Sequence, residues 1–184
     1  MKKSMSLVRS AFFLSALIFS VVIFTNVTVN ASESIDVPSV VSFSNDIPGK
    51  SPLYSIERDV FNLINQQRRK YRLNALDHDS KLADLARYYS RKMAHENFFS
   101  HYDLDGNSLI DRAEKFDIRN WRKLGENLFF CQGYVSPSQI ALDGWRKSPA
   151  HWKNILDRDW THTGIGVYET KNGKTYITQV FMKK

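Results

Sequence analysis

The order of the periodic patterns along the 184-residue chain predicts an α+β domain, in which helices come first and an antiparallel sheet forms late. Apolar residues recur at helical spacing over about residues 55–97. Two alternating segments near the end of the chain, TGIGVYET and KTYITQVF, flank the turn sequence Lys171-Asn172-Gly173. Alternation around such a turn is typical of a β-hairpin.

The first two helices are predicted from their apolar stripes. One runs from a capping Ser55 to about Arg72, and the other runs from about Asp79 to Asn97. The stripe of the first comprises Ile56, Val60, Leu63 and Ile64 and ends in the polar Gln67. The stripe of the second comprises Leu82, Leu85, Ala86, Tyr89 and Met93.

Three shorter helices are predicted from their start signals. Ser108 with Asp111 three residues later forms a capping box. The segment 136–139, Ser-Pro-Ser-Gln, combines a cap, a proline at the first helical position and a reciprocating amide, and opens a helix to about Lys147. Ser148-Pro149 repeats the cap and the proline, and predicts a short helix that carries a histidine.

The N-terminal residues 1–31 have the composition of a signal peptide, because basic residues precede an apolar run at Ala11–Phe24 and Val29-Asn30-Ala31 fits a cleavage site. The alternative is an uncleaved anchor, although the run is shorter than the ~20 residues of a membrane span. Residues 32–52 read as a flexible linker, and 53–184 as the folded domain. We therefore expect a secreted, periplasmic or cell-envelope protein without a stable transmembrane domain after cleavage.

Charge and cysteine content exclude some classes of protein. The formal net charge is +7, but no basic stripe with interleaved aromatic residues indicates a nucleic-acid partner. The densest basic segment, QQRRKYR at 66–72, is interpreted as a solvated helix end, with an anionic-ligand patch as the alternative. Cys131 is the single cysteine, so the domain has no intramolecular disulfide, and we expect a buried thiol.

Candidate site residues lie in the segment GENLFF, where Glu126 and Asn127 precede an apolar run that can form a strand at Leu128–Phe130. A buried carboxylate requires a partner or a cation, so Glu126 either caps a loop or faces a site. None of the five histidines forms a local metal-binding motif, and no nucleophile elbow is present. Taken singly, His101 and His151 can equally be packing or capping residues.

Four segments in order resemble the CAP superfamily of cysteine-rich secretory, antigen 5 and pathogenesis-related proteins. They are LINQQRRKYRLNALDHDSKLADLA, MAHENFFSHYDLDGNSLIDR, LGENLFF, and a last run that contains DGWRKSPAHWKNIL, THTGIGVY and YITQVF. The chain is similar to the disulfide-poor bacterial members over nearly all of 53–184. The resemblance implies a three-layer α-β-α sandwich with a small antiparallel sheet, and a cleft of histidines and acids that binds zinc or another divalent cation in some members.

Carried over residue by residue, the resemblance assigns His101, Glu126 and His151 to the cleft, with Asn127 holding the turn at GEN. These three titratable residues are also the implied metal ligands. Asp111 and Arg112 match a pair in which a structural ion pair is expected. A second cleft histidine and a second acid of animal and plant members are missing here, so His151 has to stand in for that histidine.

Two functions follow as alternatives. The first is an exported binding module for a lipid, a peptide or a wall polymer, favoured by the lack of a complete nucleophile–base set and by the aromatic residues Tyr102, Trp121, Trp152 and Trp160. The second is a metal-dependent hydrolase or peptidase, in which His101 and His151 bind the metal and Glu126 acts as third ligand or general base. A structural envelope protein is a third possibility, for which the sequence offers no separate support.

Overall fold

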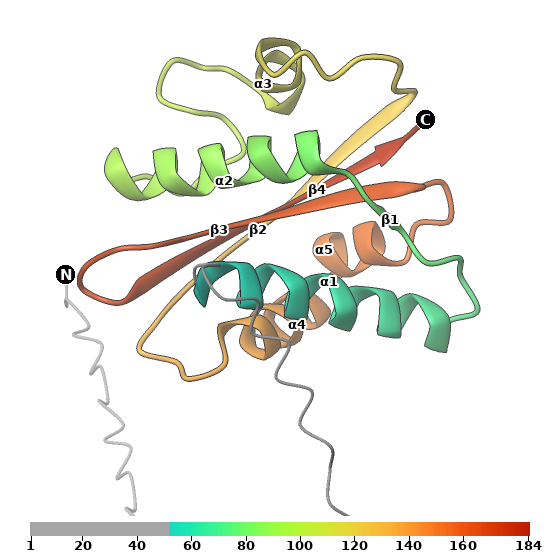
Figure 1. Ribbon diagram of the computed structural model, residues 1–184, viewed down its shortest axis with the longest axis horizontal. Coiled ribbons are helices and arrows are strands. Elements are labelled where there is room, and N and C mark those ends of the chain that lie inside the picture. The colour runs from blue at the N-terminus through green and yellow to red at the C-terminus, as the bar shows by residue number, and fades with distance from the viewer. Residues whose placement is uncertain (1–51) are drawn as a thin grey trace, which may run out of the picture. The chain divides into compact units, whose positions relative to one another are not determined.

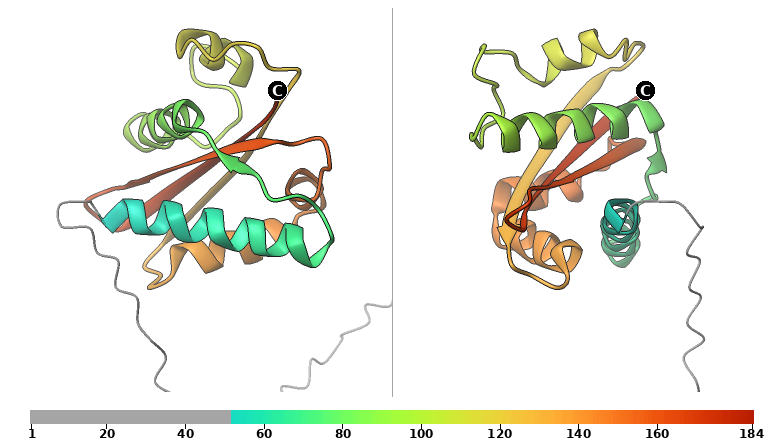
Figure 2. Two further views of the ribbon diagram at one scale, coloured as in Figure 1. Left: turned by 45° about the vertical axis from the view of Figure 1, so that its right-hand side comes forward. Right: turned by 60° about the vertical axis from the view of Figure 1, so that its left-hand side comes forward.

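The computed structural model describes residues 52–184, so the predicted signal segment and most of the linker lie outside the described residues. Its sheet has the strand order β1-β3-β4-β2. The elements are α1 (Pro52–Lys70), β1 (Asp77–His78), α2 (Ser80–His95), α3 (Leu109–Lys115), β2 (Lys123–Gln132), α4 (Pro137–Lys147), α5 (Pro149–Ile155), β3 (His162–Glu169) and β4 (Lys174–Lys183). Helices α2 and α3 lie on one face of the sheet, and α1, α4 and α5 lie on the other (Figures 1 and 2). The α+β, α-β-α prediction is confirmed.

The sheet differs from the prediction in two respects. β4 is central and pairs antiparallel with both β3 and β2, which confirms the terminal hairpin, but β1 adds a parallel two-residue pairing to β3. A pairing this short produces no alternation that a sequence pattern could reveal. β2 is ten residues long, and Glu126 and Asn127 pair with Val180 and Gln179 in its middle. The segment GEN is therefore part of a strand, and the expected turn at GEN is wrong.

The helix starts confirm one of the four proposed side-chain caps, since Ser108 forms the predicted capping box with Asp111. Helix α1 begins at Pro52, three residues before Ser55. Ser55 therefore lies within the helix and is not its cap. Ser136 and Ser148 precede their helices without a side-chain cap hydrogen bond. The side-chain amide of Gln139, which was expected to bond back to the cap of α4, donates instead to the carboxylate of Asp143 one turn later.

Helix α2 begins where its apolar stripe predicted. Asp79 is its cap, and the Asp79 side chain accepts from the backbone N–H of Leu82 at 3.1 Å. This bond satisfies one of the backbone donors that the first turn of a helix leaves without an intrahelical partner.

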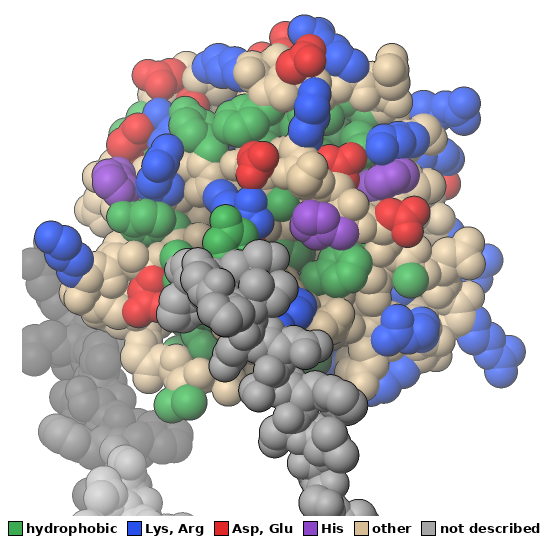
Figure 3. All heavy atoms as spheres, viewed as in Figure 1, with side chains coloured by type: hydrophobic (Ala, Val, Ile, Leu, Met, Phe, Trp, Pro, Cys, Tyr) green, Lys and Arg blue, Asp and Glu red, His purple; other side chains and the backbone are tan. Residues whose placement is uncertain are grey.

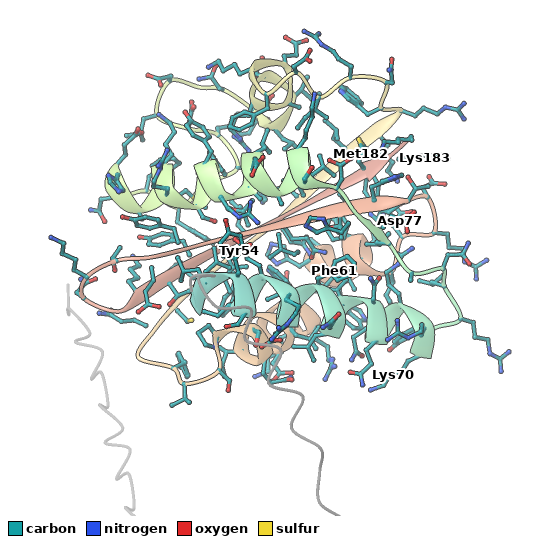
Figure 4. The ribbon with its side chains drawn as sticks, in the orientation of Figure 1. Tyr54, Phe61, Lys70, Asp77, Met182 and Lys183 are labelled. Atoms are coloured by element: carbon teal, nitrogen blue, oxygen red, sulfur yellow. The ribbon has the colours of Figure 1, made fainter. Side chains whose placement is uncertain are left out.

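Helix α1 packs its apolar stripe against the sheet through the larger hydrophobic cluster, which includes Val60 and Ile64. Phe61, labelled in Figure 4, lies on the side of α1 that faces the sheet. Its ring meets that of His78 in β1 edge-on, with 5.9 Å between the ring centroids. The basic segment after this stripe is not wholly solvated, because Arg68 is fully buried and donates to the carbonyls of Asn74, Ile155 and Asp157. Arg68 thereby joins the end of α1 to the end of α5.

Two further predictions concern burial. Cys131 is buried, as expected, and burial raises the pKa of its thiol, which disfavours the reactive thiolate. Of the four aromatic residues considered for binding, Trp160 is not available to a ligand, because it is 3% exposed and stacks on Phe181 in the core. Tyr102 is exposed.

The surface and the helices give two further findings. On the face seen in Figure 3, basic, acidic and apolar side chains are interspersed over most of the visible surface, and basic side chains gather at the lower right. Among residues 52–184, no helix combines the length and the apolarity that crossing a bilayer requires.

Candidate functional site

The predicted site residues meet at the edge of the sheet formed by β2. Glu126 lies in the middle of this edge strand, His101 lies in the loop between α2 and α3 on one face, and His151 lies in α5 on the other face. The charge of His101 contributes to lowering the pKa of His151, so the two imidazoles lie within electrostatic range of each other. The two histidines come from opposite layers of the sandwich.

Glu126 is held by two cationic or polar partners. Its Oε1 lies 2.8 Å from Nδ1 of His101, and its Oε2 accepts from Nη2 of Arg112 at 2.8 Å. The Glu126 and Arg112 side chains are 3% and 1% exposed, whereas the His101 side chain is 53% exposed. An ionised carboxylate paired with arginine only accepts hydrogen bonds. Nδ1 of His101 therefore donates, which leaves its Nε2 as an acceptor.

Arg112 also fixes the loop that carries His101. Its Nη1 donates to the carbonyls of His101 and Asn107, at 3.0 and 3.1 Å, and its guanidinium carbon lies 3.4 Å from the centroid of the Tyr89 ring. The Tyr89 hydroxyl donates to the carbonyl of Ser100 at 2.7 Å, and burial raises the pKa of this phenol. One buried cation thus positions the loop, the ring and the carboxylate.

Asn127 fastens β2 to α5. Its Nδ2 donates to the carbonyl of His151 at 3.2 Å, and its Oδ1 accepts from Nδ2 of Asn154 at 3.0 Å. Asn154 also donates to the carbonyl of Glu126 at 3.2 Å, and its own carbonyl accepts from the indole of Trp160. These amide contacts set the position of His151 relative to the strand.

An apolar pocket of about 270 Å³ opens beside His151. It is lined by Phe99, Leu128, Phe129, Phe130, Gly144, Trp145, Ser148 and His151. The imidazole of His151 makes no hydrogen bond to another described residue. Burial of the ring, and then the charge of His101, lower the pKa of His151 below its ordinary value of 6.5. At neutral pH His151 therefore presents an uncharged ring to an apolar pocket.

The lowered pKa of His151 predicts a loss of stability in acid. The unfolded chain binds a proton here at higher pH than the folded chain does, so the stability contributed by the neutral ring is fully present above pH 6.5 and decreases as pH falls through the lower folded pKa. Imidazole proton NMR measures this pKa directly, and urea unfolding at pH 5 and pH 7 should show a smaller pH dependence for His151→Gln than for the parent. A pKa at or above 6.5 would contradict the placement.

The three predicted metal ligands do not fit a three-ligand zinc site in this arrangement. Both oxygens of Glu126 already contact His101 and Arg112. Within residues 52–184, no group of three or more histidine, cysteine or carboxylate side chains is arranged to hold a metal ion. The carboxylate of Glu126 contacts the imidazole of His101, whereas no hydrogen bond or ion pair joins it to His151 within residues 52–184.

Sequence reasoning missed two parts of the site. The partner of Arg112 was expected in its own segment, yet Asp111 caps α3 while Arg112 reaches across to Glu126. The pocket beside Phe99 and Phe130 was also missed, because these residues come from a loop and a strand 31 positions apart. The only sequence signal for the pocket was FFSH at 98–101, in which two phenylalanines precede His101 in a predicted loop.

Comparison with known proteins gives the following matches. A family model described as CAP, the cysteine-rich secretory protein family, matches residues 61–181. The uncharacterized membrane protein YlbC of Bacillus subtilis (strain 168) is 34% identical over 128 residues, which are 70% of this chain and 34% of YlbC. The chain thus spans about a third of the length of this curated relative.

Solved structures show the same fold. An extracellular protein of Bacillus anthracis that contains an SCP domain is 31% identical, with a TM-score of 0.63 over 71% of this chain and 41% of that chain. An outer surface protein of Borrelia burgdorferi is 22% identical, with a TM-score of 0.65 over 73% of this chain and 97% of that chain. At this identity the second match shows the fold alone.

Proposed function

This chain belongs to the CAP, or cysteine-rich secretory protein, family, and from that premise we propose that it is an exported binding module whose ligand occupies the cleft between His101 and His151. The observation that carries the proposal is the apolar pocket that the imidazole of His151 helps to line. A ligand with an apolar group for the pocket and a polar group for Nε2 of His101 satisfies both halves of this cleft.

Export is supported by the N-terminal composition of residues 1–31 and by the extracellular and outer-surface proteins that share the fold. We propose that the protein acts outside the cytoplasm, as a secreted or cell-envelope protein. Its ligand then comes from the material available there, which comprises lipids, peptides and wall polymers.

Binding is favoured over hydrolysis by the state of Glu126. A general base needs a free carboxylate oxygen within reach of the proton that it removes. Here one oxygen accepts from Arg112 and the other from His101, and the side chain is 3% exposed. This geometry suits a carboxylate that orients an imidazole for contact with a ligand.

The test is fractionation of a bacterial envelope into lipid, peptide and wall-polymer pools, followed by calorimetric binding to residues 32–184, which retain every described residue. We expect one pool to bind, and His151→Ala and Phe99→Ala each to weaken binding about tenfold, since truncation of a central contact typically costs more than 1 kcal/mol. Arg119→Ala, at an exposed ion pair outside the cleft, serves as the control. Equal binding by the cleft variants and the parent would contradict the proposal.

A further inference from the structure

The edge strand β2 presents main-chain groups to the cleft. Just after β2, the backbone N–H of Gly133 donates to the carbonyl of Gly173, which precedes β4. Because main-chain groups alternate in direction along a strand, those of odd-numbered β2 residues face β4 and those of even-numbered residues face outward. Two side-chain contacts agree with this assignment. The carbonyls of Glu126 and Leu128 accept from Asn154 and from the indole of Trp145, which belong to the helices that cover this part of the edge.

Beyond Leu128 the edge is open. Outside the pairing with β4, the main-chain groups of Phe130 and Gln132 have no hydrogen-bond partner among residues 52–184. Phe130 is 43% exposed, and the loop that follows β2 carries the exposed Tyr134 and Val135. An open edge with unpaired N–H and C=O groups is a template for another strand.

The apolar pocket lies on this open segment, because Leu128, Phe129 and Phe130 form one of its walls. Its volume of about 270 Å³ is slightly smaller than the roughly 300–1,000 Å³ of pockets that enclose a whole small molecule. A pocket of this size beside a strand edge suits one large apolar side chain of a chain that continues past it. Strand addition uses main-chain hydrogen bonds for affinity and such pockets for specificity.

The charge at the open end is positive. The ammonium of Lys174 lies 4.5 Å from the ring centroid of Phe130 and 4.9 Å from that of Tyr176. Lys174 is paired with Gln132 in the sheet, and it makes no ion pair with a described residue. An acidic side chain at the end of an added strand would meet this cation.

We propose that the ligand of this cleft is an extended segment of another polypeptide, which adds as a strand to the edge of β2 at Phe130 and Gln132. One large apolar side chain enters the pocket beside His151, and an acidic residue contacts Lys174. The inference rests on the proposed binding function of the same cleft and narrows its ligand to one chemical class.

The test uses residues 32–184 and a synthetic peptide, acetylated and amidated, of sequence ETFTVTE. A twin peptide carries N-methyl groups at every second residue and is made with both of the two possible placements. It keeps every side chain but lacks the main-chain donors at the methylated residues. Calorimetry should show binding of the parent peptide and at least about tenfold weaker binding of the twin, because two or more main-chain hydrogen bonds are lost. Phe130→Pro, which removes the edge N–H, should weaken binding more than Phe130→Ala, which removes only the ring.

The remaining outcomes separate this inference from the proposed function. Equal binding of peptide and twin would overturn strand addition while leaving the cleft a binding site. Failure of both peptides, with binding of lauric acid that is sensitive to His151→Ala, would overturn the polypeptide assignment and retain the proposed function. Tighter binding of a peptide that copies residues 36–45 of this chain would assign the edge to the chain's own N-terminal segment and overturn the partner assignment.

Discussion

Gly166→Ala is expected to destabilise the domain by about 3 kcal/mol or more, at the upper end of the effects of overpacking. A Cβ at this position of β3 would lie 2.0 Å from the backbone nitrogen of Arg87 and 2.2 Å from the carbonyl carbon of Ala86. Both atoms belong to the backbone of α2, so a side-chain movement cannot relieve the clash, and the helix has to move away from the sheet. Urea unfolding monitored by circular dichroism measures the loss.

The matched control is Gly106→Ala. A Cβ at Gly106 meets no heavy atom within 4 Å, but the φ angle of +81° is unfavourable for alanine. We expect a loss of about 1–2 kcal/mol from the left-handed backbone alone. If Gly166→Ala costs no more than Gly106→Ala, the close contact between α2 and β3 is wrong.

Arg112→Met is expected to lower the free energy of unfolding by about 3–5 kcal/mol, because it leaves the buried Glu126 carboxylate without its cation. The pair joins side chains that are 1% and 3% exposed, and the same arginine holds the carbonyl of His101. Thermal or urea unfolding of the variant measures the effect. The imidazole signal of His101 should also change, since its loop loses an anchor.

Two further variants isolate the cause. Arg119→Met breaks an ion pair whose side chains are 64% and 73% exposed, and should cost no more than about 1 kcal/mol. The double variant Arg112→Met, Glu126→Leu removes both charges and should recover part of the stability lost by Arg112→Met alone. If the double variant is no more stable than Arg112→Met alone, the effect comes from lost packing and not from an unpaired charge.

Local patterns sufficed to predict much of the fold. The alternating segments and the turn at Lys171-Asn172-Gly173 predicted β3 and β4, and apolar spacing predicted α1 and α2. These elements are specified by neighbours in sequence, which is why a single sequence can reveal them. The two-residue β1 could not be predicted in this way, because its pairing with β3 depends on contacts 85 residues apart.

The sequence named the residues of the candidate site but could not show how they are connected. His101, Glu126 and His151 were carried over from the family resemblance, and the structure brings His101 into contact with Glu126. The buried Arg112 donates to the second oxygen of that carboxylate, so both oxygens of Glu126 have partners. Which partner saturates a buried carboxylate depends on tertiary packing, so spacing could not show it.

Amide NMR of residues 32–184 during titration with the envelope pool that binds tests the central claim most directly, because it locates the ligand on the molecule. We predict that the largest shift changes occur at Phe99, Phe130 and His151, around the open edge of β2, and that amides of α1 remote from this edge stay unchanged. Changes gathered on α1 or on the exposed face of α2, with the β2 edge unaffected, would contradict the account.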